Sequence, residues 1–104
     1  MSVESRRIIF AGPEILEALA DFCVKAERRM PDSKVKQIQY ERDGPIGVIL
    51  EFEEENVPKA SFYKNEVAAA LIMYCNKRGI PVARRAKKSL EITRDSVALH
   101  LVID

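Results

Sequence analysis

The stretch that decides the fold is NEVAAALIMYCNKRGIPVARRAKKSLEI, residues 65–92. Its first half carries apolar residues at three- and four-residue steps, which predicts a buried helix. Gly79 can take the left-handed conformation that ends many helices, Ile80 can fold back on Cys75, and Pro81 prevents continuation. We therefore expect a helix closed by a Schellman-type cap, followed by a run of cations and then by a strand.

The other elements follow from apolar periodicity and turn residues. A short apolar run before a Gly-Pro pair predicts a strand at 5–11, and a stripe at helical spacing predicts a helix at 13–30. Three further strands are expected at 34–42, 46–53 and 97–103, and a loop at 54–64. The phase of the 34–42 strand changes along its length, which predicts a β-bulge near Lys36 or Gln37.

These elements predict an α+β fold of order βαββαββ. The first six match the ferredoxin-like (split βαβ) pattern, with two helices on one face of a single antiparallel sheet. The extra C-terminal strand is expected to extend that sheet at an edge or to pair back on the strand before it. We identify no internal repeat and no linker, and expect residues 1–104 to form a single globular domain.

Composition narrows the functional classes. The chain carries 17 basic and 16 acidic residues, but residues 1–63 hold 12 acids and 9 bases while residues 64–104 hold 4 acids and 8 bases. We interpret this mild opposition as ordinary surface charge, which salt screens; the alternatives are steering of an anionic partner or head-to-tail self-association. We expect no signal peptide and no membrane segment. Cys23 and Cys75 fall at apolar helical positions, as reduced thiols do, so we expect a cytoplasmic protein.

Catalytic and metal sites are not indicated. The single histidine, His100, has no other histidine with which to share a metal, and the sequence nominates no nucleophile beside it. The acids at 51–55 are interpreted as a solvated strand end that discourages edge pairing. Four scattered glycines make no phosphate-binding loop. We therefore expect no catalytic residue, no metal ligand and no cofactor, and a protein that is not an enzyme.

One functional hypothesis is an anion-binding surface for nucleic acid, a nucleotide or an acidic protein. It rests on six cations that bracket the Gly-Ile-Pro turn: Lys77, Arg78, Arg84, Arg85, Lys87 and Lys88. The alternative interpretation is structural, with the first two cations complementing a helix C-terminus and the others lying on a solvated approach to a strand. No aromatic residue follows position 76, which disfavours base stacking.

The preferred hypothesis is an interaction or regulatory domain that forms a homodimer through its sheet face. Four apolar residues belong to the strand phase opposite the expected core and would be exposed without a partner: Ile9, Ile49, Ala98 and Val102.

Overall fold

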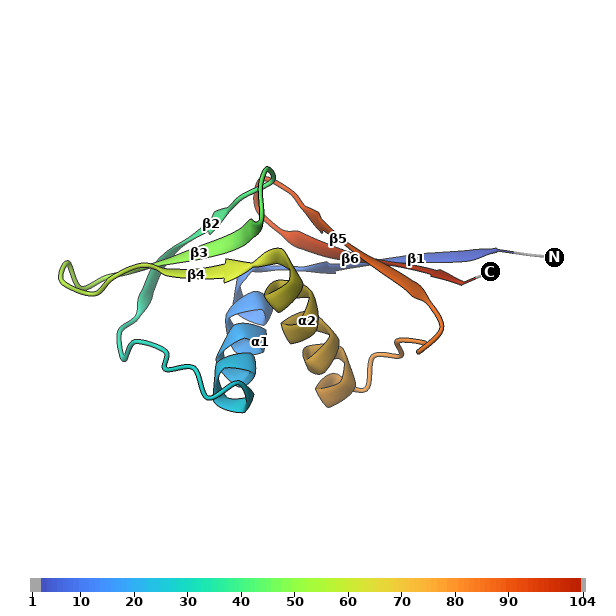
Figure 1. Ribbon diagram of the computed structural model, residues 1–104, viewed down its shortest axis with the longest axis horizontal. Coiled ribbons are helices and arrows are strands. Elements are labelled where there is room, and N and C mark those ends of the chain that lie inside the picture. Colours follow the sequence, from blue (N-terminus) through green and yellow to red (C-terminus); the bar gives the residue numbers. More distant parts are fainter. Residues whose placement is uncertain (1–2, 104) are drawn as a thin grey trace.

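The computed structural model describes residues 3–103. Two antiparallel sheets lie at an angle to each other and cover one side of a pair of helices (Figure 1). The elements in chain order are β1 (Glu4–Phe10), α1 (Gly12–Lys25), β2 (Val35–Tyr40), β3 (Ile46–Phe52), β4 (Ala60–Tyr63), α2 (Lys64–Arg78), β5 (Lys87–Ile92) and β6 (Val97–Ile103). The α+β class is confirmed. The bulge expected in the second strand is also confirmed, because the register of β2 on β3 shifts between Val35 and Gln37.

The expectation of a single antiparallel sheet was wrong. The strands form two three-stranded sheets, sheet A in the order β1-β6-β5 and sheet B in the order β2-β3-β4. The difference comes from β4, which lies within the stretch expected to be a loop. β4 occupies the free edge of β3, so β1 pairs instead with β6, and the C-terminal strand is central in sheet A. Of the two positions expected for the last strand, the structure shows the second, because β6 pairs back on β5.

A continuous core fills the space between the helices and both sheets. Its fully buried large side chains come from both helices and from strands of each sheet: Phe10, Ile15, Leu19, Val48, Leu50, Phe62, Val67, Leu71, Val97 and Leu99. Leu71 and Cys75 are 0 % exposed, which confirms that the helix of the opening stretch is buried by its apolar face. Burying such side chains is the main favourable contribution to folding.

The chain contains an internal repeat, which the sequence analysis did not identify. Each half has the order β-α-β-β, and the first strand of each half pairs with the last strand of the other. A shift of 52 residues superposes identical residues: Phe10 on Phe62, Glu14 on Glu66, Ala18 on Ala70, Leu19 on Leu71, Cys23 on Cys75, and Arg42-Asp43 on Arg94-Asp95. An approximate two-fold axis therefore passes between α1 and α2 (Figure 1).

Both helices end in the same way. Gly79 adopts the left-handed conformation, and the N–H of Ile80 donates to the carbonyl of Cys75 at 2.8 Å, which confirms the Schellman cap. In α1 the left-handed residue is Glu27, with φ of 55°. The expected end of this helix near residue 30 is therefore wrong: the left-handed turn stops α1 at Lys25.

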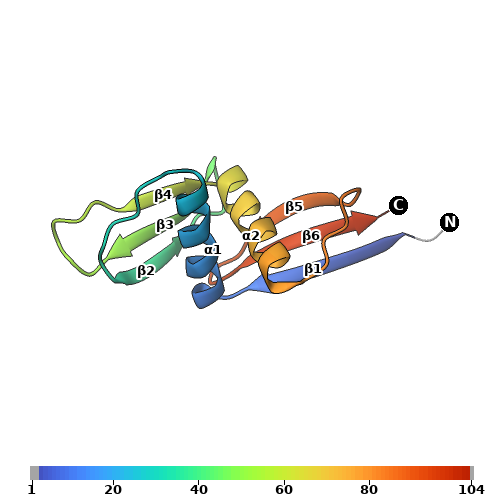
Figure 2. The same cartoon turned by 90° about the horizontal axis from the view of Figure 1, so that it is seen from below.

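The molecule is elongated, measuring 55 × 26 × 20 Å. The strands run along the long axis, while α1 and α2 cross beneath its centre (Figure 2). The helices therefore cover only the central part of the inner sheet faces. The segments 26–34 and 80–86 lie below the outer parts of sheets B and A respectively (Figure 1).

Candidate anion-binding surface

The six candidate cations separate into two groups. Lys77 and Arg78 point from α2 toward α1, where Arg78 binds Glu17 at 2.7 Å and Lys77 binds Asp21 at 2.9 Å and Glu17 at 3.3 Å. The hydrogen bond from Arg78, with a further one from Lys77, lowers the pKa of Glu17 below its usual value, and the pKa values of both cations are raised in return. These two cations are exposed, but their ion pairs with α1 join the two helices.

Arg84 and Arg85 form the tip of an ordered turn. The N–H of Ala86 donates to the carbonyl of Ala83 at 3.1 Å, which closes the turn around the two arginines. Ala86 is buried, and the ammonium of Lys88 donates to the carbonyls of Arg84 and Ala86 at 3.2 and 3.0 Å. Residues 83–86, called the basic turn below, are thus fixed by the burial of Ala86 and by the hydrogen bonds from Lys88.

The guanidinium groups of Arg84 and Arg85 have no hydrogen bond or ion pair with any residue between 3 and 103. No acid occurs in the sequence from 67 to 90, so the neighbouring chain offers no carboxylate. An unpaired arginine on a fixed backbone is well suited to bind a carboxylate or phosphate, because its planar fork of donors matches their geometry.

A cavity of about 470 Å³ opens beside the basic turn. It is lined by residues of α2, of the turn and the residue before it, and of β5: Ile72, Asn76, Val82, Arg84 and Lys88. Arg84, Lys88 and the Asn76 amide supply donors beside two aliphatic side chains, a composition typical of a site for a polar anionic group. Asn76 was not identified from sequence, although a polar residue in the last turn of an apolar helix is a usable signal.

A second cavity, of about 600 Å³, lies on the opposite side of the same segment. Its lining comes from the segment and from the outer ends of β1 and β6: Val3, Glu4, Ser5, Arg6, Pro81, Ala83, Leu101 and Ile103. Arg6 donates to the carbonyl of Pro81 at 2.8 Å and so anchors the segment to β1. Along residues 81–84, Pro81 and Ala83 therefore face the more apolar cavity, and Val82 and Arg84 face the polar one.

The four interface candidates do not form one exposed patch. Ile9, Ala98 and Val102 lie on the outer face of sheet A, the face turned away from the helices, whereas Ile49 belongs to sheet B. Ala98 is 0 % exposed between its strand partners, Ile49 and Val102 are half-buried, and only Ile9 is largely exposed, at 54 %. The expectation that all four are exposed is therefore wrong, because Ala98 is fully buried and Ile49 and Val102 are partly buried.

His100 takes part in an ion cluster on the outer face of sheet A. Its Nε2 lies 2.7 Å from a carboxylate oxygen of Glu91, and the Nε of Arg7 lies 3.0 Å from the same oxygen. His100 first, and Arg7 second, lower the pKa of Glu91. The cluster links all three strands of the sheet. Over residues 3–103, no three His, Cys, Asp or Glu side chains are grouped to hold a metal ion.

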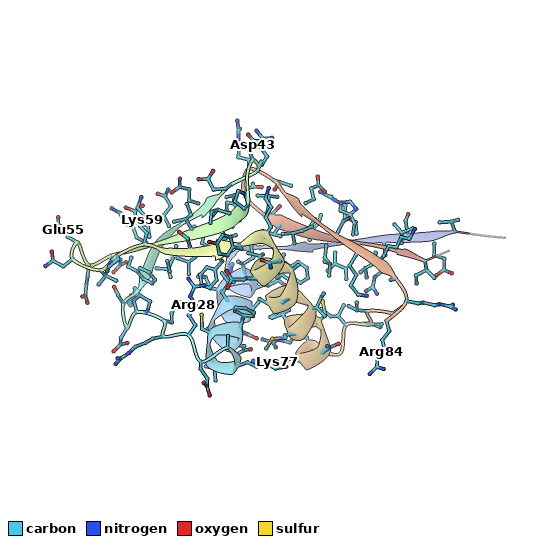
Figure 3. The ribbon with its side chains drawn as sticks, in the orientation of Figure 1. Arg28, Asp43, Glu55, Lys59, Lys77 and Arg84 are labelled. Atoms are coloured by element: carbon cyan, nitrogen blue, oxygen red, sulfur yellow. The ribbon has the colours of Figure 1, made fainter. Side chains whose placement is uncertain are left out.

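The acids expected at a strand end lie at the far end of the molecule from the basic turn. Figure 3 places Glu55 at the tip of sheet B and Arg84 below the outer part of sheet A. The acidic connection from β3 to β4 surrounds a cavity of about 390 Å³. The acidic cluster and the basic turn are therefore separated along the 55 Å axis.

Comparison with protein-family models, with curated proteins and with solved structures finds no match. No helix within the described part of the chain is long and apolar enough to cross a membrane.

Proposed function

We propose that the protein is a non-enzymatic binding module that holds an acidic protein segment at its basic turn and the adjoining polar cavity. The observation that carries the proposal is the pair of unpaired arginines, Arg84 and Arg85, at the tip of a turn fixed by Lys88 and Ala86. Because the turn is already ordered, binding a carboxylate there costs little additional backbone entropy. Lys88 and Asn76 extend the same donor surface into the cavity.

An acidic protein segment fits this surface better than nucleic acid does. Neither cavity beside the basic turn is lined by an aromatic side chain on which a base would stack. Nor do the cations form a long stripe that follows a phosphate backbone, because Lys77 and Arg78 are turned toward Glu17 and Asp21. A short run of carboxylates needs only the local cluster of donors.

Both cysteines are buried and unpaired, as is usual in a reducing compartment, and we propose that the protein acts in the cytoplasm.

The proposal is tested by fluorescence anisotropy with a labelled oligoglutamate peptide. We expect the wild type to bind the peptide, and the variant Arg84→Glu, Arg85→Glu to bind at least about tenfold more weakly, since like charges in contact cost several kcal/mol. The matched control is Arg42→Glu, Arg94→Glu, which makes the same charge change at two exposed turn residues. This control should bind more tightly than the basic-turn variant.

Two results would contradict the proposal. If the basic-turn variant binds as tightly as the control, the turn is not the site. A labelled single-stranded oligonucleotide of equal charge provides the second arm, and tighter binding of that probe than of the peptide would reject an acidic protein as the ligand class.

A further inference from the structure

We infer that the acidic segment bound at the basic turn is supplied by a second copy of this chain, through the tip of its β3–β4 connection, so that copies join head to tail. This inference rests on the proposed function and names its partner. It replaces the sheet face, where three of the four candidate residues are buried or half-buried, with the two ends of the molecule as the surfaces of self-association.

The acidic tip is an ordered turn like the basic one. The N–H of Val57 donates to the carbonyl of Glu54 at 3.2 Å, and the N–H of Glu53 donates to the carbonyl of Lys34 at 2.9 Å. Glu53, Glu54 and Glu55 are exposed. The cavity that this connection surrounds is lined by four glutamates against two lysines, so the end as a whole is acidic. Two ordered turns thus present carboxylates at one end of the molecule and guanidinium groups at the other.

The two charged ends cannot neutralise each other within one copy. They lie toward opposite ends of a 55 Å axis, whereas charges in water are screened within about 8 Å at physiological salt. Arg84 and Arg85 therefore have no carboxylate partner among residues 3–103, and the three exposed glutamates of the tip form no ion pair in the same range. A second copy brings the opposite charges together.

Apolar surface accompanies the charge at both ends. The cavity beneath β1 at the basic end has Leu101 and Ile103 in its lining. At the acidic end, Pro58 is exposed and Val57 is half-buried beside the glutamates. Both ends thus carry apolar as well as charged side chains, and contact between apolar side chains is not screened by salt.

Joining unlike ends gives a heterologous interface. Such an interface leaves one acidic and one basic end free after each addition, so it builds open chains or closes into a ring rather than stopping at a two-fold dimer. The contact is small and largely electrostatic, so we expect association that is weak and sensitive to salt.

Sedimentation velocity of the full chain tests the inference. We expect the wild type to associate at about 50 mM salt and to weaken at least about tenfold at about 500 mM salt, where the screening length shortens. The acidic-tip variant Glu54→Lys, Glu55→Lys and the basic-turn variant Arg84→Glu, Arg85→Glu should each lose association. An equimolar mixture of the two variants should regain it, because one then has two basic ends and the other two acidic ends. The turns that carry Arg42 and Arg94 are called the apex below, and the control variant Arg42→Glu, Arg94→Glu should still associate.

Circular dichroism establishes that each variant is folded, and the salt series on the wild type tests the inference even if a charge reversal unfolds the chain. A wild type that stays monomeric at both salt concentrations overturns the inference, as does a mixture that fails to regain association. If that monomer still binds oligoglutamate through Arg84 and Arg85, the proposed function stands and only the second copy is rejected. If the wild type neither associates nor binds oligoglutamate, both the inference and the proposed function are rejected.

Discussion

Cys23 and Cys75 occupy the same position in the two halves of the chain. Each lies 0–2 % exposed on the inner face of its helix, and each carbonyl accepts the hydrogen bond that closes the helix, from Arg28 at 2.9 Å and from Ile80 at 2.8 Å. The two halves thus share their core positions and their helix caps. The charged ends have no such correspondence, which makes them the part of the surface that distinguishes one half from the other.

The helix caps predict opposite effects of glycine at two equivalent sites. Replacing Glu27 by Gly should stabilise the protein by about 0.5–1 kcal/mol, because relief of the left-handed strain of about 1–2 kcal/mol exceeds the entropy that an unfolded glycine gains. Replacing Gly79 by Ala should destabilise it by about 1 kcal/mol. Urea unfolding measures both changes as shifts in midpoint at constant slope. Glu27→Ala is the control, and a gain equal to that of glycine would show that the backbone is not strained.

The equivalence of the two helices also predicts that corresponding buried residues contribute similarly to the free energy of unfolding. Leu71→Ala and Leu19→Ala each remove a fully buried side chain, so each should cost about 2–5 kcal/mol. Arg84→Ala removes an exposed side chain without a partner in the described chain and should stay within about 0.5 kcal/mol of the wild type. Thermal or urea unfolding provides the ranking. A larger loss for Arg84 than for either leucine would mean that the basic turn holds the fold together.

The ion pairs between the helices predict a contribution to stability that depends on pH. Arg78 and Lys77 lower the pKa of Glu17 below its usual value of 4.5, so the folded state favours the ionised carboxylate. The stabilisation is present above this usual value and is lost as the pH falls through the lower folded pKa. Glu17→Gln should therefore be less stable than the wild type at pH 7, with the difference shrinking as the pH falls below 4.5. Glu53→Gln, which removes an exposed glutamate of the acidic tip, should show no such convergence.

Burial predicts that both thiols react slowly in the folded protein. It raises the pKa of Cys23 and of Cys75, so at neutral pH each remains a thiol rather than the reactive thiolate. Reaction with an aromatic disulfide reagent should be at least about a hundredfold slower than in urea, because the reagent must wait for local opening. Rapid labelling of either cysteine in the native protein would contradict the packing described for its helix.

Local structure was largely predictable from the sequence. The Schellman cap at Gly79 follows from residues within one turn of the chain, and the bulge in β2 follows from a visible change of phase. Which strands become neighbours depends instead on contacts between distant residues, so alternation alone did not separate one sheet from two. The short β4, four residues beside Pro58, has too little alternation to register as a strand, and its presence redirects the pairing of β1.

The candidate site was predicted only in part. The sequence placed six cations near one turn, but it could not show that Lys77 and Arg78 reach Glu17, some 60 residues away in the chain. It likewise missed the internal repeat, because the matching residues are few and lie mostly at core and turn positions, while the surfaces of the two halves differ. Arg84 and Arg85 remain as the unpaired pair once the tertiary contacts are known.

Amide chemical shifts of the isotopically labelled protein, recorded while an oligoglutamate peptide is added, test the central claim most directly. The account predicts that the shifts concentrate on residues 83–88 and on Asn76 of the adjoining cavity, with little change at the apex turns of Arg42 and Arg94. Shifts of equal size at the apex and at the basic turn would show non-specific attraction to positive charge. Such a result would contradict the assignment of the basic turn as a binding site.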